Sequence, residues 1–139
     1  MLYRKTRDGS NAKDFHNKCD NKGNTIIFIE TTKGYKFGGY TELQWDCSSQ
    51  SKTDKSTFLF SFNKKKKFIA KNKNDSIHCY SYHGPVFGYG GGPDIYFPSN
   101  LNKGESQKNN NTFLTDRDLT NGEQYWDTKE VEVYKILFI

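Results

Sequence analysis

His16 and Cys19 are the residues whose types and spacing come nearest to a reactive thiol. They lie three positions apart in a segment that we expect to be helical, so both side chains should lie on one face. A neighbouring histidine can lower the pKa of a thiol, which would suit the scavenging of peroxide. Both positions also belong to the apolar face of the helix, where a buried thiol is usually inert. Peroxide scavenging by Cys19 is therefore an alternative to our main prediction.

A second group of conceivable ligands consists of His78, Cys79 and His83, to which Cys47 could be added. Their spacing lacks the paired Cys-x-x-Cys or His-x-x-x-His arrangement of structural zinc sites. On a strand, His78 and Cys79 would also point to opposite faces. We therefore predict no metal site, no cofactor and no catalytic group, and expect a packing cysteine and a hydrogen-bonded loop histidine.

Two charged groups are candidates for binding. The four lysines from Lys64 to Lys67 could contact an anionic lipid surface or nucleic-acid phosphates. A solvated turn is the simpler interpretation, since no base-reading motif accompanies the charge. We expect no specific nucleic-acid partner, and peripheral membrane association stays an alternative.

Glu130 and Glu132 share one face of the last expected strand, where like charges repel unless a cation or a partner offsets them. They are our candidates for an interaction surface.

Length and composition indicate one globular domain. The chain has 139 residues, a net charge of +5 and a hydrophobic fraction of only 33%, but 16% of its residues are aromatic. Phenylalanine and tyrosine must therefore supply much of the core. Three cysteines at irregular spacings argue against a disulfide framework. No signal peptide and no apolar run of about 20 residues is apparent, so we expect a cytoplasmic protein.

The elements that must position these residues are mostly strands. One helix is predicted around Ala12, Phe15, His16 and Cys19, which recur at helical spacing, with Ser10 or Asn11 as its cap. Runs rich in β-branched and aromatic residues predict strands at residues 25–30, 35–40, 57–62, 68–70, 94–97 and 128–139, with loops at 46–55 and 99–112. The fold class is therefore mainly β with a flanking helix (α+β), arranged as a β-sandwich.

A glycine-framed segment from Ile77 to Phe97 organises the second half of the chain. Pro85 and Pro93 bracket its glycine-rich loop, which lacks the Gly-Lys-Ser/Thr of a phosphate-binding loop. The segment 34–40 also combines glycines with aromatic residues, and we expect it to pack beside the segment from Ile77 to Phe97. Its Gly38-Gly39 pair predicts either a β-bulge or a close approach of another element.

Seven motifs along the chain together resemble the TLDc domain, a family that includes the oxidation resistance proteins. They are Leu2-Tyr3-Arg4 with Arg7-Asp8-Gly9; Phe15-His16-x-x-Cys19-Asp20 with Gly23; Phe37-Gly38-Gly39-Tyr40 with Trp45; Phe58-Leu59-Phe60-Ser61; Gly84-Pro85-x-Phe87-Gly88; Asp94-Ile95; and Glu130-Val131-Glu132-Val133-Tyr134. The resemblance implies a two-sheet antiparallel β-sandwich flanked by helices. It marks Gly38, Gly39, Gly84, Pro85, Phe87, Gly88 and Asp94 as structural motif residues.

The same resemblance implies a function. Family members are associated with protection against oxidative stress, and several bind the vacuolar proton-pumping ATPase. We therefore expect residues 1–139 to be a single TLDc-like domain that acts without catalysis, through a protein partner. TLDc domains usually carry a further element before the Leu-Tyr-Arg motif, so this chain is expected to lack that N-terminal element.

Overall fold

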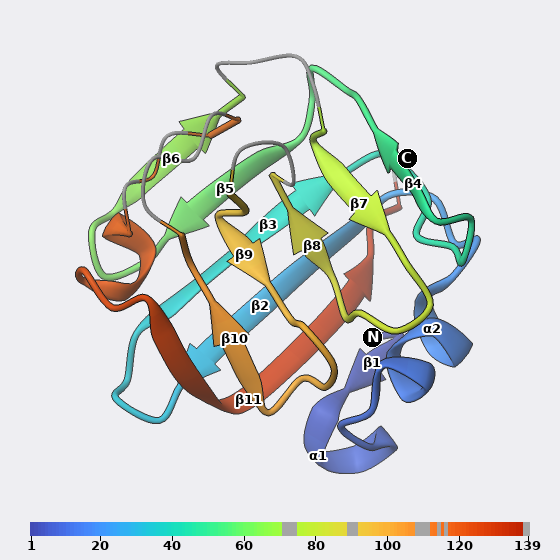
Figure 1. The fold of residues 1–139 in the computed structure, drawn as a ribbon, viewed down its shortest axis with the longest axis horizontal. Helices are drawn as coiled ribbons and strands as arrows, with labels where there is room; N and C mark the ends of the chain where they lie inside the picture. The colour runs from blue at the N-terminus through green and yellow to red at the C-terminus, as the bar shows by residue number, and fades with distance from the viewer. Residues whose placement is uncertain (71–74, 89–91, 108–111, 114, 116, 138–139) are drawn as a thin grey trace.

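The computed structural model of the protein describes residues 1–70, 75–88, 92–107, 112–113, 115 and 117–137. Its strands form two facing layers, one drawn in front of the other in Figure 1. Sheet 1 contains, in spatial order, β11 (Tyr125–Lys135), β2 (Thr25–Thr31), β3 (Lys36–Thr41), β5 (Phe58–Ser61) and β6 (Lys66–Ile69). Sheet 2 contains β10 (Lys103–Glu105), β9 (Ile95–Tyr96), β8 (Val86–Phe87), β7 (Ile77–Cys79) and β4 (Gln50–Lys52).

The long strand β11 joins the two layers. Its first residues pair with β10, and the residues from Thr128 onward pair with β2. The short strand β1 (Tyr3–Arg4) pairs with β11 further along, which places Arg4 opposite Glu132. All of the pairings between these strands are antiparallel, so the expected antiparallel sandwich is confirmed.

Aromatic rings fill the space between the layers, as the composition predicted. Phe37 and Phe97 both meet the ring of Trp126 edge-on, with ring centroids 5.1 and 5.4 Å apart. Trp45 stands edge-on to Phe87 at 5.4 Å in the same core. Edge-to-face pairs of this kind add to the free energy gained by burying the rings.

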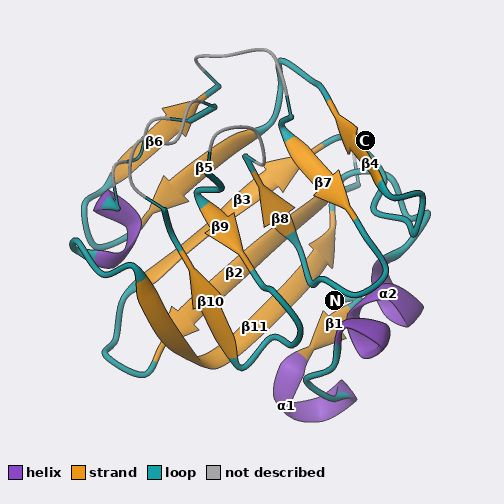
Figure 2. Ribbon diagram, viewed as in Figure 1, coloured by secondary structure: helices purple, strands orange, loops and turns teal. Residues whose placement is uncertain are grey.

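The predicted helix forms as α2 (Ala12–Cys19), and its four apolar-face positions are buried. Its first turn is held by a hydrogen bond of 3.1 Å from the Asn11 backbone N–H to the Asp14 carboxylate. A second, very short helix, α1 (Lys5–Asp8), precedes α2 in a segment for which the sequence predicted no helix. Figure 2 shows both helices at the same end of the sandwich, beside β1. A single 3₁₀ turn, η1 (Asp118–Thr120), precedes β11.

Two predicted loops contain strands. β4 lies within 46–55, and its residues are exposed or half-exposed at the edge of sheet 2. β10 lies within 99–112, where Gly104 leaves room for the Trp126 ring to lie against the backbone. Neither segment carries the apolar alternation of a half-buried strand. The side chains of β4 are mostly exposed, and the buried residue of β10 is a glycine covered by the Trp126 ring of the neighbouring strand β11.

The two glycine-rich segments pack against each other as expected. A Cβ atom on Gly39 would stand 2.7 Å from the Phe87 ring of the opposite layer. The β2–β3 register is continuous through Gly38 and Gly39, so the alternative of a β-bulge is wrong and the close approach is confirmed. Gly88 has a φ of +77°, which favours glycine, and lies against the Asp94 carboxylate. Residues 89–91 of the loop lie outside the described residues.

Gly84 and Pro85 are buried at the start of that segment. The Gly84 N–H donates to the Phe97 carbonyl at 3.1 Å, and a Cβ atom there would stand 2.9 Å from the Phe97 side chain. Among the structural motif residues, Gly39, Gly84 and Gly88 therefore lie at close contacts between segments of the core.

Candidate functional site

The solvent-facing side of sheet 1, which we call the outer face, carries several aromatic rings. Strand register places Glu132, Phe28, Gly38 and Phe60 in one row across β11, β2, β3 and β5. The neighbouring row runs through Tyr134, Ile26, Tyr40 and Phe58. Because Gly38 has no side chain, the rings of Phe28 and Phe60 approach across it to 5.5 Å between centroids.

The predicted alternation of β5 is confirmed, and the structure assigns its faces. Leu59 and Ser61 are buried toward the core, whereas Phe58 and Phe60 lie half-buried on the outer face. Phe62, just after the strand, is 54% exposed and stacks on Phe28 with centroids 6.1 Å apart. Solvent-exposed rings gathered in one place are typical of an interaction surface.

An acidic hollow adjoins these rings. Its volume is about 250 Å³, and its lining is Phe28, Ile29, Glu30, Lys36, Phe62, Glu130 and Glu132. The structure thus brings the two predicted glutamates together with the aromatic rings of the outer face. We call this feature the acidic hollow.

The positive charge of Arg4 in β1 offsets one of the two glutamates, Glu132. Its Nη2 atom lies 2.9 Å from Glu132, which also accepts a hydrogen bond of 2.9 Å from the Tyr134 hydroxyl. The hydrogen bond from Arg4 is the main cause that lowers the pKa of Glu132. Glu132 therefore stays ionised well below neutral pH.

Glu130 is held by neutral donors of α1. Its carboxylate accepts from the Thr6 backbone N–H at 3.2 Å and from the Thr6 hydroxyl at 2.5 Å. Within the part of the chain that the structure describes, no cationic side chain lies within 4.0 Å of the Glu130 carboxylate. The acidic hollow can therefore offer a fixed carboxylate and a stack of rings to a basic side chain, which both would attract.

The lysine run is an exposed turn whose last members also cover rings. Lys64 to Lys67 are all exposed. The Nζ atom of Lys67 lies 4.3 Å from the centroid of the Phe58 ring, and that of Lys66 lies 5.1 Å from Phe68. Lys66 also lies 3.5 Å from Asp118. The predicted solvated turn is confirmed for Lys64 and Lys65.

Replacing Lys64 and Lys65 together by glutamine should change the free energy of unfolding by less than about 0.5 kcal/mol, because both side chains are solvated. Lys67→Gln should cost more, about 0.5–1 kcal/mol, because it removes the cation over Phe58. Urea unfolding of the two variants gives the comparison. Equal losses would contradict the distinction between the two halves of the run.

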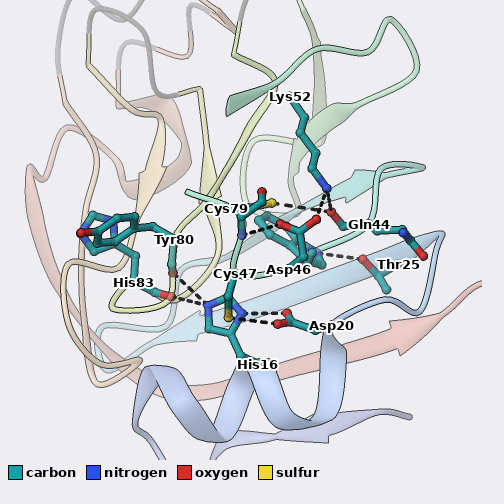
Figure 3. A network of polar contacts seen from close by, with 12 residues as sticks. His16, Asp20, Thr25, Gln44, Asp46, Cys47, Lys52, Cys79, Tyr80 and His83 are labelled. Atoms are coloured by element: carbon teal, nitrogen blue, oxygen red, sulfur yellow. Dashed lines mark hydrogen bonds and ion pairs between the residues drawn. The ribbon is translucent and has the colours of Figure 1, made fainter. Parts of the chain in front are cut away.

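A second polar group, shown in Figure 3, joins α2 to two loops. His16 Nδ1 lies 2.7 Å from one oxygen of Asp20, whose other oxygen lies 3.4 Å from the Cys47 thiol. His16 Nε2 lies 3.0 and 2.9 Å from the carbonyl oxygens of Tyr80 and His83. Burial lowers the pKa of His16, but Asp20 and the two carbonyls together raise it above its ordinary value. We call His16, Asp20 and Cys47 the polar cluster.

Cys19 does not join the polar cluster. Its side chain is fully buried, and this burial strongly raises the pKa of the thiol. Both ring nitrogens of His16 face other partners. The pairing of His16 with Cys19 that would activate the thiol is therefore wrong, and the assignment of both residues to the core is confirmed.

The grouping of His78, Cys79 and His83 likewise has ordinary partners. The Cys79 thiol is buried and lies 3.6 Å from the Gln44 carbonyl, and burial raises its pKa to about 11. His78 contacts Ser51 at 3.0 Å, and His83 contacts the Tyr96 hydroxyl at 3.3 Å.

The sequence did not indicate that Cys47 would instead meet His16 and Asp20. The only available signal was the i, i+4 spacing of those two residues on α2.

Among the helices that the structure describes, none has the length and apolar character needed to span a membrane.

One relative is the mTOR-associated protein MEAK7 of Danio rerio, which is 33% identical over 61 residues. The match covers 44% of this chain and 14% of that protein. The family model for the TLDc domain matches residues 1–137. The chain therefore belongs to the TLDc domain family.

Proposed function

We propose that this chain is a non-catalytic interaction domain that binds a protein partner through the outer face of sheet 1. The observation that carries the proposal is the position of the exposed Phe62 ring, stacked on Phe28 beside the acidic hollow. Rings on a rigid sheet lose little conformational freedom on binding, and such residues often supply much of the binding energy. The partner should present a basic side chain to Glu130.

The family suggests the biological setting. We propose a role in protection against oxidative stress, with subunits of the vacuolar proton-pumping ATPase as partner. The name of the zebrafish relative, mTOR-associated, describes association with another protein, which supports a binding role. All three cysteines are free thiols, which suits the reducing cytoplasm.

The alternatives from the sequence have less support. Scavenging by Cys19 needs an accessible thiolate, whereas this thiol is fully buried and its pKa is raised. Binding of an anionic surface through the lysine run has exposed charge in its favour. It lacks the rings and the hollow that would shape a specific contact.

The acidic part of the contact is tested with Glu130→Gln. Loss of the negative charge should weaken binding to purified subunits of the ATPase roughly tenfold at low salt, since charges at an interface act mainly through electrostatic attraction. Glu123→Gln is the matched control, because Glu123 pairs with Lys33 outside the acidic hollow. Equal binding by the two variants in a biosensor assay would argue against a contact at Glu130.

The scavenging alternative has its own test. Cys19→Ala, in protein that still melts cooperatively, should retain the peroxide resistance that the wild type confers on cells. Loss of resistance with an unchanged melting temperature would favour thiol chemistry over protein binding.

A further inference from the structure

The polar cluster brings together three kinds of side chain that bind transition metals. The ligand atoms of His16, Asp20 and Cys47 all lie within 4.8 Å of one another. Two of them come from α2 and its C-terminal cap, and the third comes from the loop between β3 and β4. Figure 3 shows Cys47 directly beside the His16 ring and the Asp20 carboxylate.

The hydrogen-bond partners of His16 indicate which ring nitrogen carries a hydrogen and what must lie at the other nitrogen, Nδ1. Nε2 faces two carbonyl oxygens, which only accept hydrogen bonds, so Nε2 must carry a hydrogen. Nδ1 faces the Asp20 carboxylate at 2.7 Å, which also only accepts when it is ionised. A positive centre is therefore required at Nδ1, and either a second proton or a metal ion can supply it.

The Cys47 thiol donates a second hydrogen bond to the same carboxylate. Its sulfur lies 3.4 Å from the other oxygen of Asp20. A divalent ion that replaces both protons leaves a neutral imidazole, a carboxylate and a thiolate around a double positive charge. The total charge of the cluster is then the same with two protons as with the metal, so binding introduces no net charge into this partly buried place.

We propose that His16, Asp20 and Cys47 bind a divalent metal ion of the zinc class. Imidazole, carboxylate and thiolate are all ligands of tetrahedral zinc. In such a site, ligand oxygen and sulfur lie about 3.5 Å apart and ligand nitrogen and oxygen about 3.3 Å apart. Cys47 Sγ lies 3.4 Å from Asp20 Oδ2, whereas His16 Nδ1 lies 2.7 Å from the other oxygen, Oδ1. A metal bound to one of these oxygens therefore needs small side-chain shifts that bring the nitrogen and the sulfur to tetrahedral spacing around it.

The surroundings of the cluster resemble those of a metal site. The donation from His16 Nε2 to the carbonyls of Tyr80 and His83 fixes the ring with Nδ1 toward the ligands, which is how proteins orient a metal-bound histidine. The loop that carries Cys47 is tied to the end of α2 by a bridge between Asp20 and Trp45 and by a hydrogen bond of 2.8 Å from Asn21 N–H to the Trp45 carbonyl. The three ligands are thus positioned before any metal arrives.

Cys47 is exposed, so the fourth position of the metal would face solvent. A water molecule or a small anionic ligand could occupy it. The polar cluster shares no residue with the acidic hollow. Metal binding is therefore a property separate from partner binding at the outer face.

Cobalt(II) is the direct probe, because a thiolate bound to cobalt gives a charge-transfer absorption that free cobalt lacks. Titration of the wild-type protein should produce this band at one equivalent, and zinc should displace it. Cys47→Ser should abolish the band, and Asp20→Asn should weaken cobalt binding by ten- to a hundredfold. Cys79→Ala is the matched control, because it removes a thiol outside the polar cluster, and it should keep the band.

Two further measurements make the outcome unambiguous. The far-ultraviolet circular dichroism of each variant establishes that it is folded, which the exposed position of Cys47 favours. Isothermal titration with zinc should give a wild-type affinity at least tenfold above that of Cys47→Ser. A missing cobalt band in the wild type, or a band that survives in folded Cys47→Ser, would overturn the proposal.

Discussion

Gly38→Ala is expected to lower the free energy of unfolding by about 3 kcal/mol, at the upper end of the range for overpacking. The added Cβ atom would collide with the Ile27 carbonyl oxygen of β2 and would stand 2.8 Å from the Phe60 ring. A ring can turn aside, but a backbone carbonyl within a sheet cannot move without disturbing the β2–β3 pairing. The substitution should therefore weaken the centre of sheet 1, and chemical denaturation measures the loss.

Gly34→Ala provides the control for that experiment. Gly34 lies in the turn between β2 and β3, where a Cβ atom would have no neighbour within 4 Å, but its φ is +91°. The variant therefore suffers only backbone strain and the change in chain entropy, about 1 kcal/mol. If Gly38→Ala were no more harmful than Gly34→Ala, the close approach across β3 would not be the reason for a glycine there.

Asp94→Asn is expected to remove a large part of the pH dependence of stability between pH 4 and 7. Burial raises the pKa of Asp94 to about 7, although hydrogen bonds from Thr115, one of 2.8 Å from its hydroxyl, act in the opposite direction. In the unfolded chain this carboxyl ionises at its ordinary pKa of about 3.9. Folding therefore favours the protonated form, and the folded protein loses stability as pH rises from about 4 to about 7.

The size of this effect follows from the difference between the two pKa values. A difference of about three units corresponds to at most about 4 kcal/mol, spread over that pH interval. Asparagine keeps an oxygen for Thr115 and places its amide near Gly88, where the other carboxyl oxygen is buried without a described hydrogen-bond partner. Because the amide does not ionise, the variant should gain stability relative to wild type as pH rises.

Urea unfolding of both proteins at pH 4, 5.5, 7 and 8 measures the difference. Asp127→Asn serves as the control, because the Asp127 side chain is 59% exposed and its loss should leave the pH profile nearly unchanged. Parallel profiles for wild type and Asp94→Asn would contradict the burial of an ionisable carboxyl at this position.

Patterns of local burial were sufficient to predict much of the fold. The four apolar positions of α2 and the alternation of β5 are properties of single segments, so they are visible in the sequence. β10 was missed because its one buried residue is Gly104, which the Trp126 ring covers from another strand. α1 was missed because it has four residues and buries none of them, so it has no apolar face.

The candidate site was predicted only in part. Glu130 and Glu132 stand out because like charges alternate on one strand, but the sequence does not reveal that Phe28 and Phe62 lie beside them. Likewise, His16 and Asp20 are neighbours on one helix, whereas Cys47 reaches them through the tertiary fold. Contacts between distant segments depend on register and packing, which local composition does not encode.

Phe62→Ser tests most directly whether the outer face binds the partner. Phe62 is 54% exposed, and Tyr82, which is 71% exposed and outside the acidic hollow, provides a matched control as Tyr82→Ser. Affinity for purified subunits of the vacuolar proton-pumping ATPase should fall at least tenfold in Phe62→Ser and stay unchanged in Tyr82→Ser, with both variants folded. No binding by the wild type, or equal affinities of wild type and Phe62→Ser, would contradict the account.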